Sequence, residues 1–135
     1  MNRFRVGFSF SGSLRELVSQ IAELFVFRFS SEEVLYDKYH EPEFSRSDLD
    51  VYLPRLYVDD TDLIVVFVSE DYTERDWCGL EWEAIRTIKK KEPHKVMLCR
   101  IGNKSLEGLY DPGFFQLEDK SFGEIADAIK LRHNM

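Results

Sequence analysis

The sequence predicts an α/β protein in which a central parallel β-sheet of about five strands is covered by helices on both faces. Strand-like and helix-like segments alternate along the chain, which is the pattern that builds parallel sheets. Residues 62–68 form an almost unbroken apolar run, typical of a strand buried on both faces at the centre of such a sheet. A chain of 135 residues can bury a substantial core, so we expect residues 1–135 to form a single domain.

The N-terminal segment predicts a strand, a tight loop and a helix. Residues 5–10 alternate apolar with small side chains and carry aromatic rings, which favours a strand. Apolar residues then recur at helical intervals over residues 14–25, and residues 13–16 read Ser-Leu-Arg-Glu, the Ser-x-x-Glu form of a capping box. The loop at residues 9–13 offers hydroxyl groups, a glycine and helix amides that suit an anion. The alternative is that this polar turn only connects two elements.

The middle of the chain predicts a short strand, a long loop and a second helix. The strand is expected over residues 33–36, and a polar loop that contains a proline follows over residues 37–47. A loop of this length in a compact domain is usually functional or mobile. We expect the helix to begin near Ser47 or Asp48 as the N-cap residue, with Pro54 either delaying its start or bending it.

The C-terminal half continues the alternation of helix and strand. After the central strand, a helix is expected over residues 76–88, and the basic run at residues 89–91 closes it because cations are favourable at a helix C-terminus. Strands are expected over residues 95–101 and 114–117. The last helix is expected over residues 121–132, where apolar residues again recur at helical intervals.

Glu81 is the residue that departs from the pattern of its helix. At about 100° per residue, Glu81 lies on the apolar side of the helix, four residues after Trp77 and four before Ile85. Glu83, by contrast, points to the polar side. A carboxylate on the apolar side must be paired, protonated or facing a cleft that the sheet does not fill. The apolar side of this helix consists of Trp77, Leu80, Ala84, Ile85 and Ile88.

The position of this helix favours a functional role for Glu81. The helix begins just beyond the carboxyl end of the buried strand at residues 62–68, and open α/β sheets bind their ligands outside such strand ends. We therefore expect Glu81 to face a cleft. The alternative is that its side chain extends past the edge of the core or forms a buried hydrogen bond without a chemical role.

Composition excludes several classes of protein. The formal net charge of -7 argues against a general nucleic-acid binder, which would carry a basic surface. No apolar run approaches the roughly 20 residues of a membrane helix, and the first residues lack a signal-peptide core, so we expect a cytoplasmic protein without a membrane partner. The cysteines and histidines lack metal-ligand spacing, and two cysteines make no disulfide framework, so no metal is expected.

Four segments match the pattern of a known family. They are the opening Val6-Gly7-Phe8-Ser9-Phe10-Ser11, the segment Leu35-Tyr36-Asp37-Lys38-Tyr39, the strand that ends at Ser69, and Trp77-Cys78-Gly79-Leu80-Glu81. The last has the form Trp-Cys-x-x-Glu at the start of the third long helix and is the most specific of them. On these segments the chain resembles, over nearly its whole length, a TIR (Toll/interleukin-1 receptor) domain of the bacterial kind.

The resemblance implies a flavodoxin-like fold and, in the enzymatic members of the family, cleavage of the nicotinamide–ribose bond of NAD+. The glutamate of the motif is the family's catalytic residue and falls on Glu81, with NAD+ as substrate and no cofactor. Trp77 either stacks beside the cleft or packs in the core, and Cys78 is expected to pack rather than to act as a nucleophile. The implied substrate-binding residues are Phe10, Ser11, Gly12, Asp37, Trp77 and Cys78.

The leading interpretation is an NAD+ glycohydrolase of bacterial anti-phage immunity that yields nicotinamide and either ADP-ribose or a cyclic isomer. Its expected partners are other TIR domains, through self-association, and a sensor or oligomerisation domain outside this chain if the chain is a fragment rather than a stand-alone domain. The alternative is a non-enzymatic module that docks with other TIR domains through the loop at residues 37–47 and the neighbouring helices. Glu81 favours the enzyme, because docking gives no reason for an inward carboxylate. A response-regulator receiver is disfavoured, since the central strand ends in Val68-Ser69 rather than in an acidic cluster.

Overall fold

The computed structural model describes residues 2–72, 76–102 and 113–134, and for residues 76–80 it describes the backbone alone. Its centre is a five-stranded sheet in the order β2-β1-β3-β4-β5, in which every neighbouring pair runs parallel. The strands are β1 (Phe4–Phe10), β2 (Val34–Leu35), β3 (Thr61–Val68), β4 (Val96–Arg100) and β5 (Phe114–Gln116). This is the strand order of the flavodoxin-like fold, so the predicted α/β architecture with a parallel sheet is confirmed.

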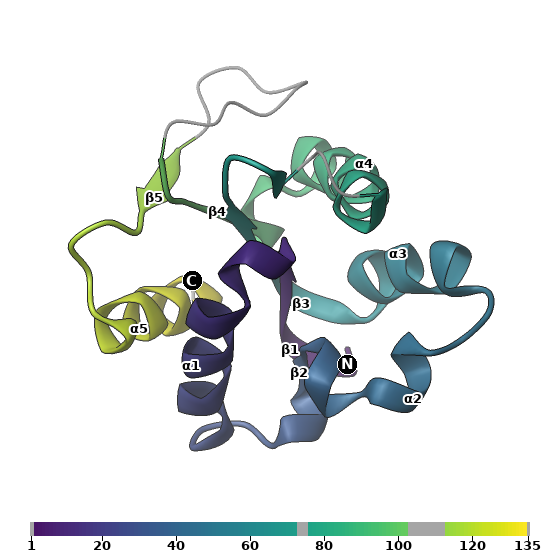
Figure 1. Cartoon of the computed structure of the whole chain (residues 1–135), viewed down its shortest axis with the longest axis horizontal. Coiled ribbons are helices and arrows are strands. Elements are labelled where there is room, and N and C mark those ends of the chain that lie inside the picture. The colour runs from purple at the N-terminus through teal and green to yellow at the C-terminus, as the bar shows by residue number, and fades with distance from the viewer. Residues whose placement is uncertain (1, 73–75, 103–112, 135) are drawn as a thin grey trace.

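Helices cover both faces of the sheet (Figure 1). Helices α1 (Arg15–Val26) and α5 (Phe122–His133) lie side by side on one face, and α3 (Leu49–Asp59) and α4 (Asp76–Lys91) lie together on the other. The short helix α2 (Glu41–Phe44) precedes α3. None of the helices in the described ranges is long and apolar enough to cross a lipid bilayer.

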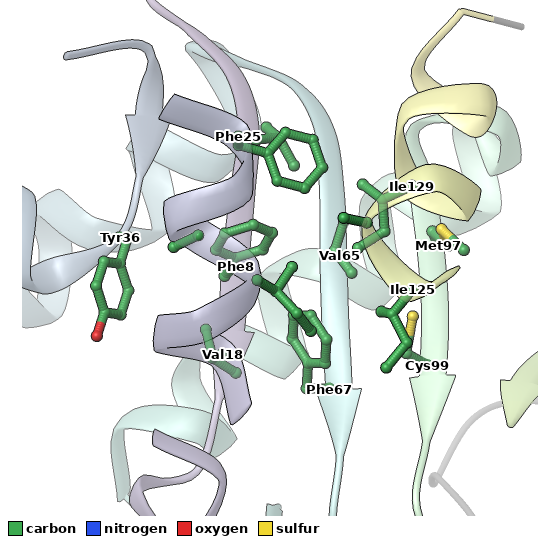
Figure 2. Packing of buried hydrophobic residues seen from close by; sticks show 14 of the residues in the cluster. Phe8, Val18, Phe25, Tyr36, Val65, Phe67, Met97, Cys99, Ile125 and Ile129 are labelled. Atoms are coloured by element: carbon green, nitrogen blue, oxygen red, sulfur yellow. The ribbon is translucent and has the colours of Figure 1, made fainter. Parts of the chain in front are cut away.

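Strand β3 contributes to two hydrophobic cores because successive side chains on a strand point to opposite faces of the sheet. One set of its side chains packs with α1 and α5, and Figure 2 shows this core around Phe8 and Phe25. The other set packs with α3 and α4. Burial of each such side chain stabilises the fold by about 1.5–3 kcal/mol relative to exposure. The first set is Leu63, Val65 and Phe67, and the second is Ile64, Val66 and Val68.

The start of α1 differs from the prediction. A 3₁₀ turn, η1 (Gly12–Leu14), precedes the helix with Ser11 as its N-cap, and α1 itself begins at Arg15 without a side-chain cap. The capping box expected at residues 13–16 is therefore wrong, because the Ser13 hydroxyl donates to the Asp71 carboxylate at 2.9 Å instead. A capping box does form at the start of α5, where the Ser121 side chain accepts from the backbone amide of Glu124 at 3.1 Å.

The segment at residues 37–47 contains regular structure where the sequence predicts a continuous loop. The 3₁₀ turn η3 (Asp37–Tyr39) and helix α2 occupy most of it. Pro42 lies in the first turn of α2, where its fixed φ suits the helix and its missing amide would have had no partner within the helix. Helix α3 begins at Leu49, directly after Asp48 as predicted, and it continues through Pro54 without a delayed start.

Candidate active site

Glu81 faces a pocket at the carboxyl ends of the central strands. Helix α4 anchors Ile85 and Ile88 in the core between the sheet and α3, where they are 0% and 6% exposed. Glu81 lies on the same side of α4 one turn earlier, is 8% exposed and lines the pocket. The prediction that this carboxylate turns inward and faces a cleft is confirmed.

The pocket lies where the order of the strands reverses. The chain passes from β1 to β2 on one side and returns to β3 on the other side of β1, and ligands of open α/β sheets bind at such a switch point. The pocket volume is about 480 Å³, within the range of roughly 300–1,000 Å³ found for small-molecule sites. The apolar and aromatic part of its lining consists of Phe8, Phe10, Phe44, Leu49, Leu53 and Tyr57.

The Glu81 carboxylate is held from the side of the sheet. The hydroxyl of Ser9, on β1, donates to Oε1 of Glu81 at 2.6 Å, and the Ser9 oxygen is also hydrogen-bonded to the Tyr72 hydroxyl. Ser9 and Tyr72 are both 0% exposed. A serine hydroxyl has one proton to donate, so when Ser9 donates to Glu81 the Tyr72 hydroxyl donates to Ser9.

Burial dominates the ionisation of Glu81. It raises the pKa of this carboxyl to about 7, because transfer out of water disfavours the charged form. The hydrogen bond donated by Ser9 acts in the opposite direction, and the negative charge of Asp37 raises the pKa further. Near neutral pH the carboxyl is therefore divided between its protonated and ionised forms, which is the condition in which a side chain can serve chemistry at that pH.

A paired cation and anion form another part of the pocket lining. The Arg15 guanidinium donates two hydrogen bonds to the Asp37 carboxylate, at 2.8 and 2.6 Å, and lies 5.0 Å from the centre of the Phe10 ring. The same ion pair raises the pKa of Arg15, so the guanidinium stays charged. The pocket thus presents an aromatic ring, a cation and two carboxyl groups around one cavity.

A second serine–carboxylate cluster lies at the same edge of the sheet. The Asp71 carboxylate accepts hydrogen bonds from the hydroxyls of Ser11 (2.9 Å), Ser13 (2.9 Å) and Ser69 (2.6 Å). These bonds tie the turn after β1 to the turn after β3. Because the hydroxyls of Ser11 and Ser13 already donate to a carboxylate, the loop at residues 9–13 favours the connector interpretation over an anion site.

The structure brings together most of the site residues that the sequence predicts. Phe10, Gly12, Asp37 and Glu81 all line the pocket. Ser11 does not line it, since its side chain is 1% exposed and donates to Asp71. Two further predictions, Trp77 and Cys78, fall in the first turn of α4, and their side chains lie outside the described part of the chain.

The sequence does not identify two of the lining residues, Arg15 and Tyr57, or the buried Ser9 that hydrogen-bonds Glu81. The sequence predicts Arg15 only as part of a capping box, and it gives no separate prediction for Tyr57 in the second helix. The sequence places Ser9 in the predicted strand, the polar loop and the first matching segment, but it gives no partner for the Ser9 side chain, which lies between two phenylalanines inside β1. A hydroxyl in an otherwise apolar strand is the signal that could have identified it, because a buried hydroxyl requires a hydrogen-bond partner.

The arrangement suits chemistry that uses a single carboxylate. An ionised Glu81 in a largely apolar pocket can stabilise a positive charge that develops on a bound molecule, and a protonated Glu81 can donate a proton. Among the described residues, no group of three or more histidine, cysteine, aspartate or glutamate side chains is placed to hold a metal ion.

Comparisons with known proteins add no assignment. The chain matches no protein-family model, and it matches no curated protein.

Proposed function

We propose that the chain is a TIR domain that cleaves the bond between nicotinamide and ribose in NAD+. The observation that carries the proposal is the position of Glu81. The glutamate of the Trp-Cys-x-x-Glu motif is 8% exposed and lines a pocket of about 480 Å³ at the carboxyl ends of the strands. Resemblance and geometry, which are independent of each other, single out the same side chain.

The reaction requires one well-placed negative charge. When the bond between the ribose C1′ and the nicotinamide nitrogen breaks, its electron pair leaves with neutral nicotinamide and the ribose acquires oxocarbenium character. The Glu81 carboxylate stabilises that positive charge as it develops. Attack of water on C1′, with loss of a proton, gives ADP-ribose. Attack by a group of the same molecule gives a cyclic isomer instead.

The rest of the pocket lining is compatible with a nucleotide-like substrate. Phe10 contributes an aromatic residue to the lining, and the guanidinium of Arg15 lies beside it, paired with the Asp37 carboxylate. Leu49 and Leu53 of α3 contribute apolar surface to the pocket that Glu81 lines. An apolar lining strengthens the interaction between a carboxylate and a developing cation.

The test is release of nicotinamide from NAD+ by the purified chain, measured over a range of protein concentrations together with the identity of the product. We expect Glu81→Gln to lower the rate by at least about 100-fold, because removing a group that stabilises the transition-state charge typically costs 10²–10³-fold. Glu83→Gln is the matched control. It removes a carboxylate two residues away on the exposed side of α4 and is expected to leave the rate unchanged.

The cellular role follows from how activity depends on assembly. A rate per molecule that rises with protein concentration would support activation by self-association with other TIR domains, as in a bacterial immune response triggered by a sensor. Equal rates for wild type and Glu81→Gln would contradict the assignment of Glu81. No release of nicotinamide at any concentration would favour a docking module in place of an enzyme.

A further inference from the structure

A buried line of three hydrogen-bonding groups ends at Glu81. It runs from the Tyr72 hydroxyl to the Ser9 hydroxyl and from there, over 2.6 Å, to Oε1 of Glu81. Ser9 and Tyr72 are 0% exposed. The backbone amide of Tyr72 donates to the Ser69 carbonyl at 3.2 Å, which holds Tyr72 at the end of β3.

We propose that Ser9 and Tyr72 are positioning residues for Glu81: their hydrogen-bonded line directs the carboxylate into the pocket and favours its ionised form. This inference rests on the proposed function and adds two residues that act on the reaction through Glu81. Neither side chain has to touch the substrate for this role.

The strand geometry explains how Ser9 can position the Glu81 carboxylate. Ser9 pairs in register with Val66 of β3, so its backbone is held in the middle of the sheet. Its neighbours Phe8 and Phe10 pack with the core beneath α1 and α5, and alternation along the strand directs Ser9 toward α4. The hydroxyl therefore reaches Glu81 from a rigid element, with little freedom to follow a moving carboxylate.

The direction of the hydrogen bonds from Tyr72 through Ser9 favours the ionised form of Glu81. Each hydroxyl has a single proton, so Ser9 donates to Glu81 and Tyr72 donates to Ser9 when the carboxylate is charged. Hydrogen bonds donated to a carboxylate stabilise its charged form. Protonation of Glu81 at Oε1 would require the line to reverse or the bond to Ser9 to break.

Other groups around Glu81 act on its ionisation as well. The Tyr57 hydroxyl of α3 lies near Glu81 and donates to the Phe8 carbonyl at 2.7 Å, and Asp37 of η3 raises the pKa of Glu81 through its charge. Arg15 of α1 pairs with Asp37 and partly offsets that charge. These groups come from elements other than β1, so a change at Ser9 leaves them in place.

The direct test is the titration of the Glu81 carboxyl, followed by carbon NMR of ¹³C-labelled protein. The Glu81 signal is identified by its absence from Glu81→Gln. In Ser9→Ala we expect the carboxyl to titrate about one pH unit higher than in the wild type, because one hydrogen bond to the charged form is lost. Tyr72→Phe is expected to shift the titration less, in the same direction. It provides a second measurement if Ser9→Ala folds poorly.

Ser69→Ala is the matched control for the titration. It removes one buried serine hydroxyl that donates to a carboxylate at 2.6 Å, but that carboxylate is Asp71. The Glu81 titration should stay at its wild-type value in this variant. A titration of Ser9→Ala that coincides with the wild type would overturn the inference.

Kinetics separate this inference from the proposed function. In Ser9→Ala we expect kcat for NAD+ cleavage to fall roughly fivefold at pH 7 and to recover at pH 9, with KM little changed, because only the ionised fraction of Glu81 differs. A kcat loss that persists at pH 9 would contradict control through ionisation. If the wild type releases no nicotinamide while the Ser9→Ala titration still shifts, the proposed function fails and the effect of Ser9 on Glu81 is upheld.

Discussion

Two carboxylates at the same edge of the sheet, Glu81 and Asp71, both accept hydrogen bonds from buried serines, yet their surroundings differ. Asp71 accepts from three hydroxyls and ties the turns after β1 and β3 together. Glu81 accepts from one serine, is 8% exposed and lines the pocket. A carboxylate surrounded by donors acts as a structural brace, whereas one with few donors beside a cavity keeps the capacity to act on a ligand.

The pH dependence of stability should show the largest difference between Glu81 and an ordinary carboxylate. The pKa of Glu81 is raised from 4.5 to about 7 by burial, so between these values the folded chain holds a proton that the unfolded chain has lost. The free energy of unfolding therefore falls as the pH rises through this window. Relative to Glu81→Gln, the wild type is expected to lose about 3 kcal/mol between pH 4.5 and pH 8.

Urea denaturation of wild type and Glu81→Gln across this pH range measures the difference. Glu43 does not obscure it, because the pairing with Arg3 lowers the pKa of Glu43 to about 2, and its contribution is lost only below this window. Parallel stability curves for the two proteins would show that Glu81 ionises as it would in water, and the contrast with Asp71 would then disappear.

Asp71→Ala should have a smaller effect, and on stability rather than chemistry. The substitution leaves the buried hydroxyls of Ser11 and Ser69 without their carboxylate acceptor, at about 1 kcal/mol or more each, so we expect the free energy of unfolding to fall by about 2 kcal/mol. The rate of nicotinamide release per folded molecule should change far less than in Glu81→Gln. If folded Asp71→Ala lost as much activity as Glu81→Gln, this result would mean that Asp71 also takes part in the reaction.

Ser13→Ala should have the smallest effect. Ser13 also donates to Asp71, but it lies at an exposed position where water can replace the lost hydroxyl. Surface substitutions of this kind usually change the free energy of unfolding by less than about 0.5 kcal/mol. A loss several times larger in urea denaturation would mean that the cluster around Asp71 acts as a unit in which every hydroxyl is needed.

Helix α4 shows which buried positions the helical repeat of the sequence predicts and which it does not. The inward positions of Glu81, Ile85 and Ile88 and the outward position of Glu83 follow from the helical repeat and are confirmed. Trp82 was not expected inside, yet it is 3% exposed. The reason is that α4 packs against α3 as well as against the sheet, so its buried side is wider than one apolar stripe. A single sequence does not reveal which helix becomes the neighbour.

The order of apolar and polar residues by itself determined the parallel sheet, its central strand and the inward direction of Glu81, because these depend on the repeat of side chains along a strand or a helix. Only the tertiary structure decided which side chains surround Glu81. Ser9 lies 72 residues away in the chain, and Arg15, Asp37 and Tyr57 come from three further elements. Their convergence depends on the strand order and on the packing of α3 beside α4, which bring together residues that no local pattern relates.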